Sequence, residues 1–353
     1  MSVFVNSVKL CSRFTIVRRI NKALFCRENI KFLNGRMSGC HAKLPACTFL
    51  SGGGRKTSSR YCVLFSGLLG FFRSEETEPE SELILTMKRS VLLMQRGELD
   101  KAEQMLHLAL KMAQELQNAQ AVTYVYDLLA NLAYDRGDLV KAEPLFVSVL
   151  QRLLGSGTPA SDNKVVHISL KIADIFTKRR EPSKAENGFK FCVENLEKKI
   201  DAGVDDEDTL TLWGMTLDWF GRFLLEENRA AEALECFEKA YRTSLKVHGE
   251  EHEQTVVLLN DLGTVAFLCG DHDRAVGYLG HAVEVGRRLP GMQDFAAVHV
   301  NLGAVYLKKG MYREARHACE TALRDARAHD NKEGVEEANT CLDQVKRFLH
   351  SEQ

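Results

Sequence analysis

The sequence predicts an all-α protein: a right-handed superhelical solenoid of five to six helix pairs plus a C-terminal capping helix. Three observations predict this fold. The same helix–turn–helix pattern recurs six times at a nearly constant spacing, glycines mark the turns inside the pairs, and an unpaired amphipathic segment closes the chain. Because one helical pair cannot bury its apolar face alone, such pairs have to stack into a continuous core.

Each copy joins a first helix with a small residue in its middle to a second helix that carries alanine and a large apolar residue. The clearest copy runs from Leu302 and Gly303 to Tyr306, and then to Ala315 and Ala322. Small residues let neighbouring helices approach, while large ones fill the space between layers. The small positions of the first helices are Ser90, Ala130, Ala173, Gly221, Gly263 and Gly303, which lie 40, 43, 48, 42 and 40 residues apart.

Local signals predict where the helices end and begin. A glycine that adopts the left-handed conformation without a Cβ penalty commonly terminates a helix, and four glycines lie where a first helix has to end: Gly97, Gly137, Gly270 and Gly310. The segments Asp100–Glu103 and Ser183–Glu186 have the pattern of capping boxes, so we expect second helices to begin there. Residues 331–350 place Val335, Ala338 and Leu342 on one face, as a capping helix requires.

These features resemble the tetratricopeptide repeat family over about residues 81–330. The shared pattern is a small residue in the first helix, then alanine and a large apolar residue in the second. The spacing exceeds the usual 34 residues. It resembles the longer repeats of kinesin light chains, as do Ala142–Phe146 and Lys246–His252. The resemblance implies first helices that line a concave, partner-binding groove.

The first sixty residues differ in charge from the rest. They hold twelve Lys or Arg and one acid, Glu28, which leaves 35 basic and 47 acidic residues and a net charge of about −12 for the remainder. Basic, Ser-rich N-termini with interleaved apolar residues are typical of organelle transit peptides. We predict that residues 1–60 are a mitochondrial transit peptide. A disordered basic tail or a nucleic-acid-binding arm is the alternative.

Residues 61–80 are predicted to link this segment to the repeat domain at 81–350. Residues 61–72 carry no charge but are shorter than the roughly 20 residues that cross a bilayer. We expect them to end the presequence, to lie at a membrane interface or to pack on the repeats. Residues 74–80 form an acidic spacer that contains Pro79.

No residue set predicts catalysis, a cofactor or a metal. Residues 51–57 lack the spacing of a phosphate-binding loop, and His248 and His252 have no third metal ligand nearby. The ten cysteines include no C-x-x-C pair, so we expect neither a zinc site nor a disulfide framework. We predict a protein that is not an enzyme and binds neither nucleic acid nor a small-molecule substrate; a protease or hydrolase site without a sequence signature is the alternative.

Polar residues on the first helices are the candidate partner-binding set. Asn side chains donate and accept hydrogen bonds, as a peptide backbone requires, and Arg or Lys can anchor acidic groups. Most of the positions that match a chaperone-tail clamp hold other residues, among them Asp127, Lys171 and Trp219, which disfavours that ligand. The candidates are Asp127, Asn131, Tyr134, Asp174, Asp218, Arg222, Asn260, Thr264, Asn301 and Lys308.

The presequence, apolar segment, acidic spacer and long repeats together resemble a mitochondrial branch of the family. That resemblance implies a factor on the matrix side of the inner membrane that serves respiratory complex III. It implies that the partners are complex III and the Rieske iron–sulfur subunit or its N-terminal fragments, which the factor helps to clear. The alternative is a cytosolic cargo or cytokinesis adaptor, which the kinesin-like repeats favour.

Overall fold

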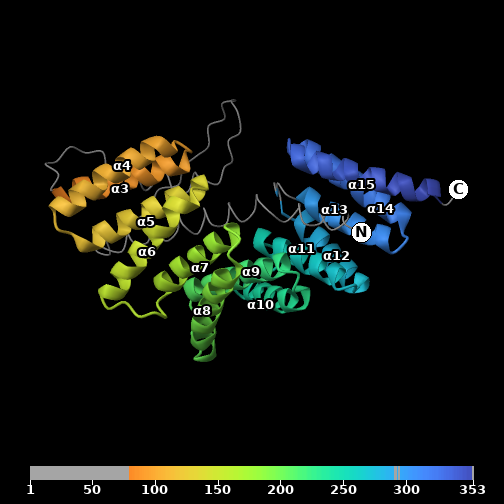
Figure 1. Cartoon of the computed structure of the whole chain (residues 1–353). Helices are drawn as coiled ribbons and strands as arrows, with labels where there is room; N and C mark the ends of the chain where they lie inside the picture. Colours follow the sequence, from red (N-terminus) through yellow and green to blue (C-terminus); the bar gives the residue numbers. More distant parts are fainter. Residues whose placement is uncertain (1–78, 290–291, 293–294, 352–353) are drawn as a thin grey trace, which may run out of the picture. The chain divides into compact units, whose positions relative to one another are not determined.

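The computed structural model describes residues 79–289, 292 and 295–351, and every regular element among them is an α-helix (Figure 1). The predicted all-α repeat fold is therefore confirmed. The predictions for residues 1–60 and for most of 61–80 lie outside the described residues, and α3 begins at Pro79. The helices are α3 (Pro79–Gln95), α4 (Leu99–Glu115), α5 (Ala119–Arg136), α6 (Leu139–Gly155), α7 (Asn163–Lys178), α8 (Pro182–Asp201), α9 (Glu207–Glu226), α10 (Ala230–His248), α11 (Glu253–Leu268), α12 (His272–Arg287), α13 (Phe295–Lys308), α14 (Tyr312–Ala328) and α15 (Lys332–Ser351).

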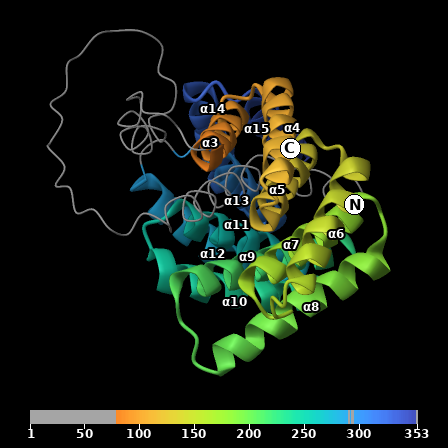
Figure 2. The same cartoon turned by 90° about the vertical axis from the view of Figure 1, so that its left-hand side faces the viewer.

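The chain divides inside α5, between Leu132 and Ala133, into two compact units. In the first, α3 packs against α4. In the second, α7 packs with α8, α9 with α10, α11 with α12 and α13 with α14, and each pair contacts the next. Figure 2 shows these helices, coloured green to blue, following one another back and forth along the chain. The first helices of the pairs also contact each other directly, as α7 does with α9 and α11 with α13.

The small residues predicted at the helix crossings allow the close approach that this packing requires. A Cβ atom added to Gly263 of α11 would come within 2.5 Å of Leu279 in α12. A Cβ atom on Gly221 of α9 would lie 3.0 Å from the ring of Phe237 in α10, which is itself fully buried. The alanines of the second helices, such as Ala233 and Ala275, are also fully buried. The small and large apolar residues that define the repeat in the sequence are therefore the residues that pack the two helices of each pair together.

The turn glycines are confirmed, but the two capping boxes are wrong. Gly97 and Gly270 adopt left-handed backbone angles, with φ of 77° and 85°. However, α4 begins after Glu98 and α8 after Glu181, and neither of these residues caps its helix with a side-chain hydrogen bond. Each helix starts after the single residue that follows the left-handed residue of the turn, so Asp100 and Ser183 already lie in the first helical turn. Aspartates directly after turn glycines cap instead, as Asp138 and Asp271 do for α6 and α12.

The closing helix α15 packs on α14 and α13, as the sequence predicts for a cap. The sequence predicts no disulfide framework, but it did not anticipate the one disulfide that Cys319 of α14 and Cys341 of α15 form, with their Cα atoms 5.8 Å apart. Both sulfurs lie close to where a Cβ of Gly303 would be. Helix packing brings together two cysteines that are 22 residues apart, which their scattered spacing did not indicate. This bond ties the capping helix to the last repeat.

Candidate functional site

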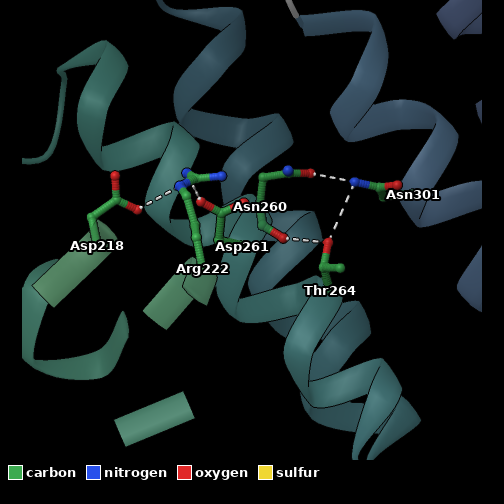
Figure 3. A network of polar contacts seen from close by, with 6 residues as sticks. All are labelled: Asp218, Arg222, Asn260, Asp261, Thr264 and Asn301. Carbon is green, nitrogen blue, oxygen red and sulfur yellow. Dashed lines mark hydrogen bonds and ion pairs between the residues drawn. The ribbon is translucent and has the colours of Figure 1, made fainter. Parts of the chain in front are cut away.

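The polar candidates of the second unit meet along the first helices of the repeats, at α5, α7, α9, α11 and α13. Figure 3 shows six residues of this row, in which side chains of α9 contact α11 and side chains of α11 contact α13. Each contact joins neighbouring repeats through residues about 40 positions apart in sequence, such as Arg222 and Asp261. This row of polar side chains therefore runs across the stacked first helices. The side chains are charged at some interfaces between repeats and uncharged at others.

The central contact is a buried cluster of two carboxylates and one guanidinium. Arg222 Nε donates to Asp218 Oδ1 at 3.1 Å, within α9, and Arg222 Nη2 donates to Asp261 Oδ2 on α11. The side chains of Asp218 and Asp261 are each only 5% exposed, and that of Arg222 is 19% exposed. With both acids ionised, the cluster holds one negative charge in excess in a region of low dielectric, which is costly unless the charge is neutralised.

Burial, together with the neighbouring carboxylate, shifts the pKa of Asp261. Burial raises the pKa of its carboxyl from 3.8 to about 7; Arg222 opposes the rise, and Asp218 adds to it. Burial lowers the pKa of Arg222, but the two carboxylates raise it, and the net shift is upward. Arg222 therefore stays charged, and the cluster accommodates its excess negative charge by holding a proton on Asp261 at mildly acidic pH.

This pKa predicts a stability that falls as pH rises. The folded state holds the Asp261 proton up to about pH 7, whereas the unfolded chain releases it near pH 4. Stability therefore declines across this window, by up to roughly 1.4 kcal/mol per pH unit, and the loss is complete above the folded pKa. In Asp261→Asn, which cannot ionise, the melting temperature should vary less between pH 5 and pH 8.5 than in the wild type. Parallel melting profiles for the two proteins would contradict this assignment.

The next interface, between α11 and α13, is uncharged. Asn301 Nδ2 donates to Asn260 Oδ1 at 2.8 Å and lies 3.4 Å from Thr264 Oγ1. The Thr264 hydroxyl donates to the backbone carbonyl of Asn260 at 2.9 Å. All three side chains are buried. This amide–hydroxyl contact satisfies buried polar groups that would otherwise cost about 1–3 kcal/mol each.

The remaining candidates are more exposed or bond locally. Tyr134 of α5 donates to Asp174 of α7, while Lys178 lies 2.7 Å from the Tyr134 hydroxyl, with its ammonium 4.1 Å from the ring centroid. Lys178 also forms an ion pair with Asp174. In the first unit, Asn131 donates to the carbonyl and the carboxylate of Asp127, one turn earlier in α5. Lys308 is exposed at the end of α13.

Most of the candidates thus lie close together, but their side chains form hydrogen bonds and ion pairs with one another. Asn131, Asp218 and Asn260 are buried, so removing all three would reduce stability as well as any partner contact. Sequence reasoning missed Asp261. The signal was its position two residues before Gly263, which corresponds to that of Asn301 before Gly303. Partner contact by the candidate set stays a prediction, and the members that are not buried are Asp127, Tyr134, Asp174, Arg222 and Lys308.

Comparison with known proteins identifies the relatives of this chain. Tetratricopeptide repeat models match residues 211–288 and 296–325. The mitochondrial tetratricopeptide repeat protein 19 homolog of Drosophila melanogaster is 37% identical over 285 residues, which cover 81% of this chain and 77% of the relative. The chain belongs to the tetratricopeptide repeat protein 19 family. The mitochondrial human member is 34% identical over 280 residues, covering 76% of this chain and 73% of its own length.

Solved structures support the repeat fold of this tetratricopeptide repeat protein 19 family member. The apo form of RapI matches with a TM-score of 0.61 at 12% identity, covering 82% of this chain and 80% of RapI. BtubC from P. vanneervenii matches with a TM-score of 0.52 at 19% identity, over 72% of this chain and 93% of its own. At these identities the likeness concerns the fold alone.

Within the described part of the chain, no three His, Cys, Asp or Glu residues gather as metal ligands would. In the same residues no helix has the length and apolar character needed to span a membrane. Membership of a repeat-scaffold family favours a protein-binding role over catalysis.

Proposed function

We propose that this chain is a protein-binding scaffold of the mitochondrial inner membrane, on the matrix side, that serves respiratory complex III. In this role it binds the complex and promotes clearance of N-terminal fragments of the Rieske iron–sulfur subunit. The observation that carries the proposal is the identity of 34–40% to family members that are named mitochondrial. The basic segment 1–60, with twelve Lys or Arg and one acid, agrees with import into mitochondria.

The repeat domain supplies binding rather than chemistry in this proposal. Its first helices present a row of residues able to donate and accept hydrogen bonds, and Tyr134, Asp174 and Lys308 remain partly or fully accessible in that row. Acidic residues outnumber basic ones by about twelve after residue 60, so electrostatic steering favours basic partner segments and weakens at high salt.

Co-purification tests this function. The full chain, expressed in mitochondria, should retain complex III, and Asp174→Asn combined with Lys308→Ala should retain severalfold less while keeping the same helical content. Lys332→Ala, at an exposed position on α15, is the matched control and should behave like the wild type. Wild-type retention by the double variant would show that the first-helix face is not the working surface. No retention of complex III by the wild type would contradict the function itself.

A further inference from the structure

The position four residues after the first buried alanine of a second helix holds a large apolar side chain in every described pair before the last. In α4, α6, α8, α10 and α12 these side chains are almost completely buried: Leu106, Phe146, Phe189, Phe237 and Leu279. In α14 the same position, four residues after Ala315, holds Cys319. Because a cysteine side chain is much smaller than that of leucine or phenylalanine, another group has to fill the crossing between α13 and α14.

That group is a second sulfur atom, which comes from α15. Cys319 forms a disulfide with Cys341, and the two residues are 0% and 4% exposed. A Cβ atom on Gly303 of α13 would lie 2.8 Å from Cys319 Sγ and 3.0 Å from Cys341 Sγ. At the corresponding Gly221 of α9, the nearest atoms belong to the ring of Phe237, at 3.0 Å. The two bonded sulfurs therefore occupy the place that a phenylalanine or leucine takes in the other pairs.

Apart from this bond, α15 is attached through small side chains. It packs on α14 and α13, whereas an inner helix such as α11 packs with α10, α12 and α13. Its larger Phe348 and Leu349 are exposed, and its described buried apolar side chains are those of Ala338, Cys341 and Val345. Since the free energy gained by burial scales with apolar area, these contacts hold the cap less firmly than a buried phenylalanine or leucine would.

We propose that the Cys319–Cys341 pair is a reversible redox switch that controls whether the capping helix α15 stays docked on the last repeat. A chain stabilised throughout by disulfides would pair its other cysteines, but Cys192, Cys236 and Cys269 are free. The bond in the described chain lies instead between the cap and the repeat that it covers. The switch acts on α15 and not on the first-helix row, so it goes beyond the proposed function and does not depend on it.

Thiol–disulfide exchange with a protein dithiol of the thioredoxin class opens the switch. Cys319 is completely buried, so the reductant reaches Cys341 when α15 opens locally. One thiolate of the reductant attacks the Cys341 sulfur, the S–S bond breaks, and Cys319 leaves with the bonding electron pair and takes up a proton. The second thiol of the reductant attacks the mixed disulfide and releases Cys341 as a thiol, which leaves the reductant oxidised to a disulfide. The oxidised form of the dithiol re-forms the bond by the reverse reaction.

Hydrogen exchange followed by mass spectrometry tests the switch in the purified full chain. Because the bond closes a loop between cysteines 22 residues apart, the amides of α15 should exchange at least about tenfold faster after reduction with dithiothreitol than after oxidation with glutathione disulfide. The amides of α9 and α10 are the internal reference and should exchange equally in both states. Equal exchange of α15 in the two states would overturn the proposal, as would an oxidised protein without a Cys319–Cys341 cross-linked peptide.

Three variants assign the effect to this pair. Cys341→Ala removes the bond, so α15 should exchange at least as fast as in the reduced wild type, with or without dithiothreitol. Cys319→Leu combined with Cys341→Ala restores the residue type that α12 has at this position, which keeps the test available if the single variant fails to fold. Cys269→Ser removes an exposed free cysteine and is the matched control, which should respond as the wild type does. A response to the reductant in either variant that lacks the pair would overturn the proposal.

Thiol trapping in intact cells tests reversibility. The disulfide-linked fraction of the pair should rise when diamide oxidises the cellular thiols and should fall again after diamide is removed. A pair that stays in one state throughout would be a fixed bond or two unpaired thiols, and either result would overturn the proposal. None of these measurements involves complex III, so their failure leaves the co-purification test of the proposed function intact.

Discussion

Arg222→Met should destabilise the second unit by about 3–5 kcal/mol at pH 8, because it leaves two buried carboxylates without their shared cation. Asp218 and Asp261 both direct oxygens at this guanidinium and are almost completely buried. The loss should shrink toward pH 5, where the raised pKa of Asp261 allows protonation to remove one charge. Urea unfolding followed by tryptophan fluorescence measures it, since both tryptophans of the chain, Trp213 and Trp219, lie in α9.

A double-mutant cycle distinguishes this electrostatic cause from a simple loss of packing. Adding Asp261→Asn to Arg222→Met removes one of the stranded charges, so the double variant should be more stable than the sum of the two single effects predicts. Additive losses, or a loss below about 1 kcal/mol for Arg222→Met, would show that the cluster is not a coupled charge network.

Phe237→Ala should cost about 3–5 kcal/mol, because the ring is fully buried and fills the crossing between α9 and α10. Gly221 faces the ring so closely that the helices cannot collapse far into the cavity without moving their backbones. Val140→Ala is the matched control, since this apolar side chain is 78% exposed and its loss should change stability by less than about 0.5 kcal/mol. Equal effects of the two substitutions in urea unfolding would contradict the packing scheme.

The sequence predicted those features that depend on a residue's place in the repeat. Gly221 and Gly263 were identified as crossing positions and Gly97 as a turn, because each recurs at the repeat spacing and only a small or left-handed residue suits its place. The helix starts were less predictable. A capping box and an acid in the first turn have the same local pattern, so Asp100 was misassigned by two residues.

Contacts between repeats were harder to predict, because they depend on the rotation of each helix about its axis. Asp261 joins Arg222 across α9 and α11, and Cys319 joins Cys341 across α14 and α15. Neither pairing follows from the pattern within a single repeat. The polar candidates were correctly placed on the first helices, but their burial, which makes Asn260 and Asn301 partners of each other, required the packed structure.

The most direct test of the central claim is the fate of the Rieske subunit in cells that lack this protein. Immunoblotting with an antibody to the N-terminal region of the subunit should reveal accumulated fragments, together with reduced complex III activity, and re-expression of the full chain should clear the fragments and restore activity. Fragment levels and complex III activity equal to those of normal cells after complete deletion would contradict the account.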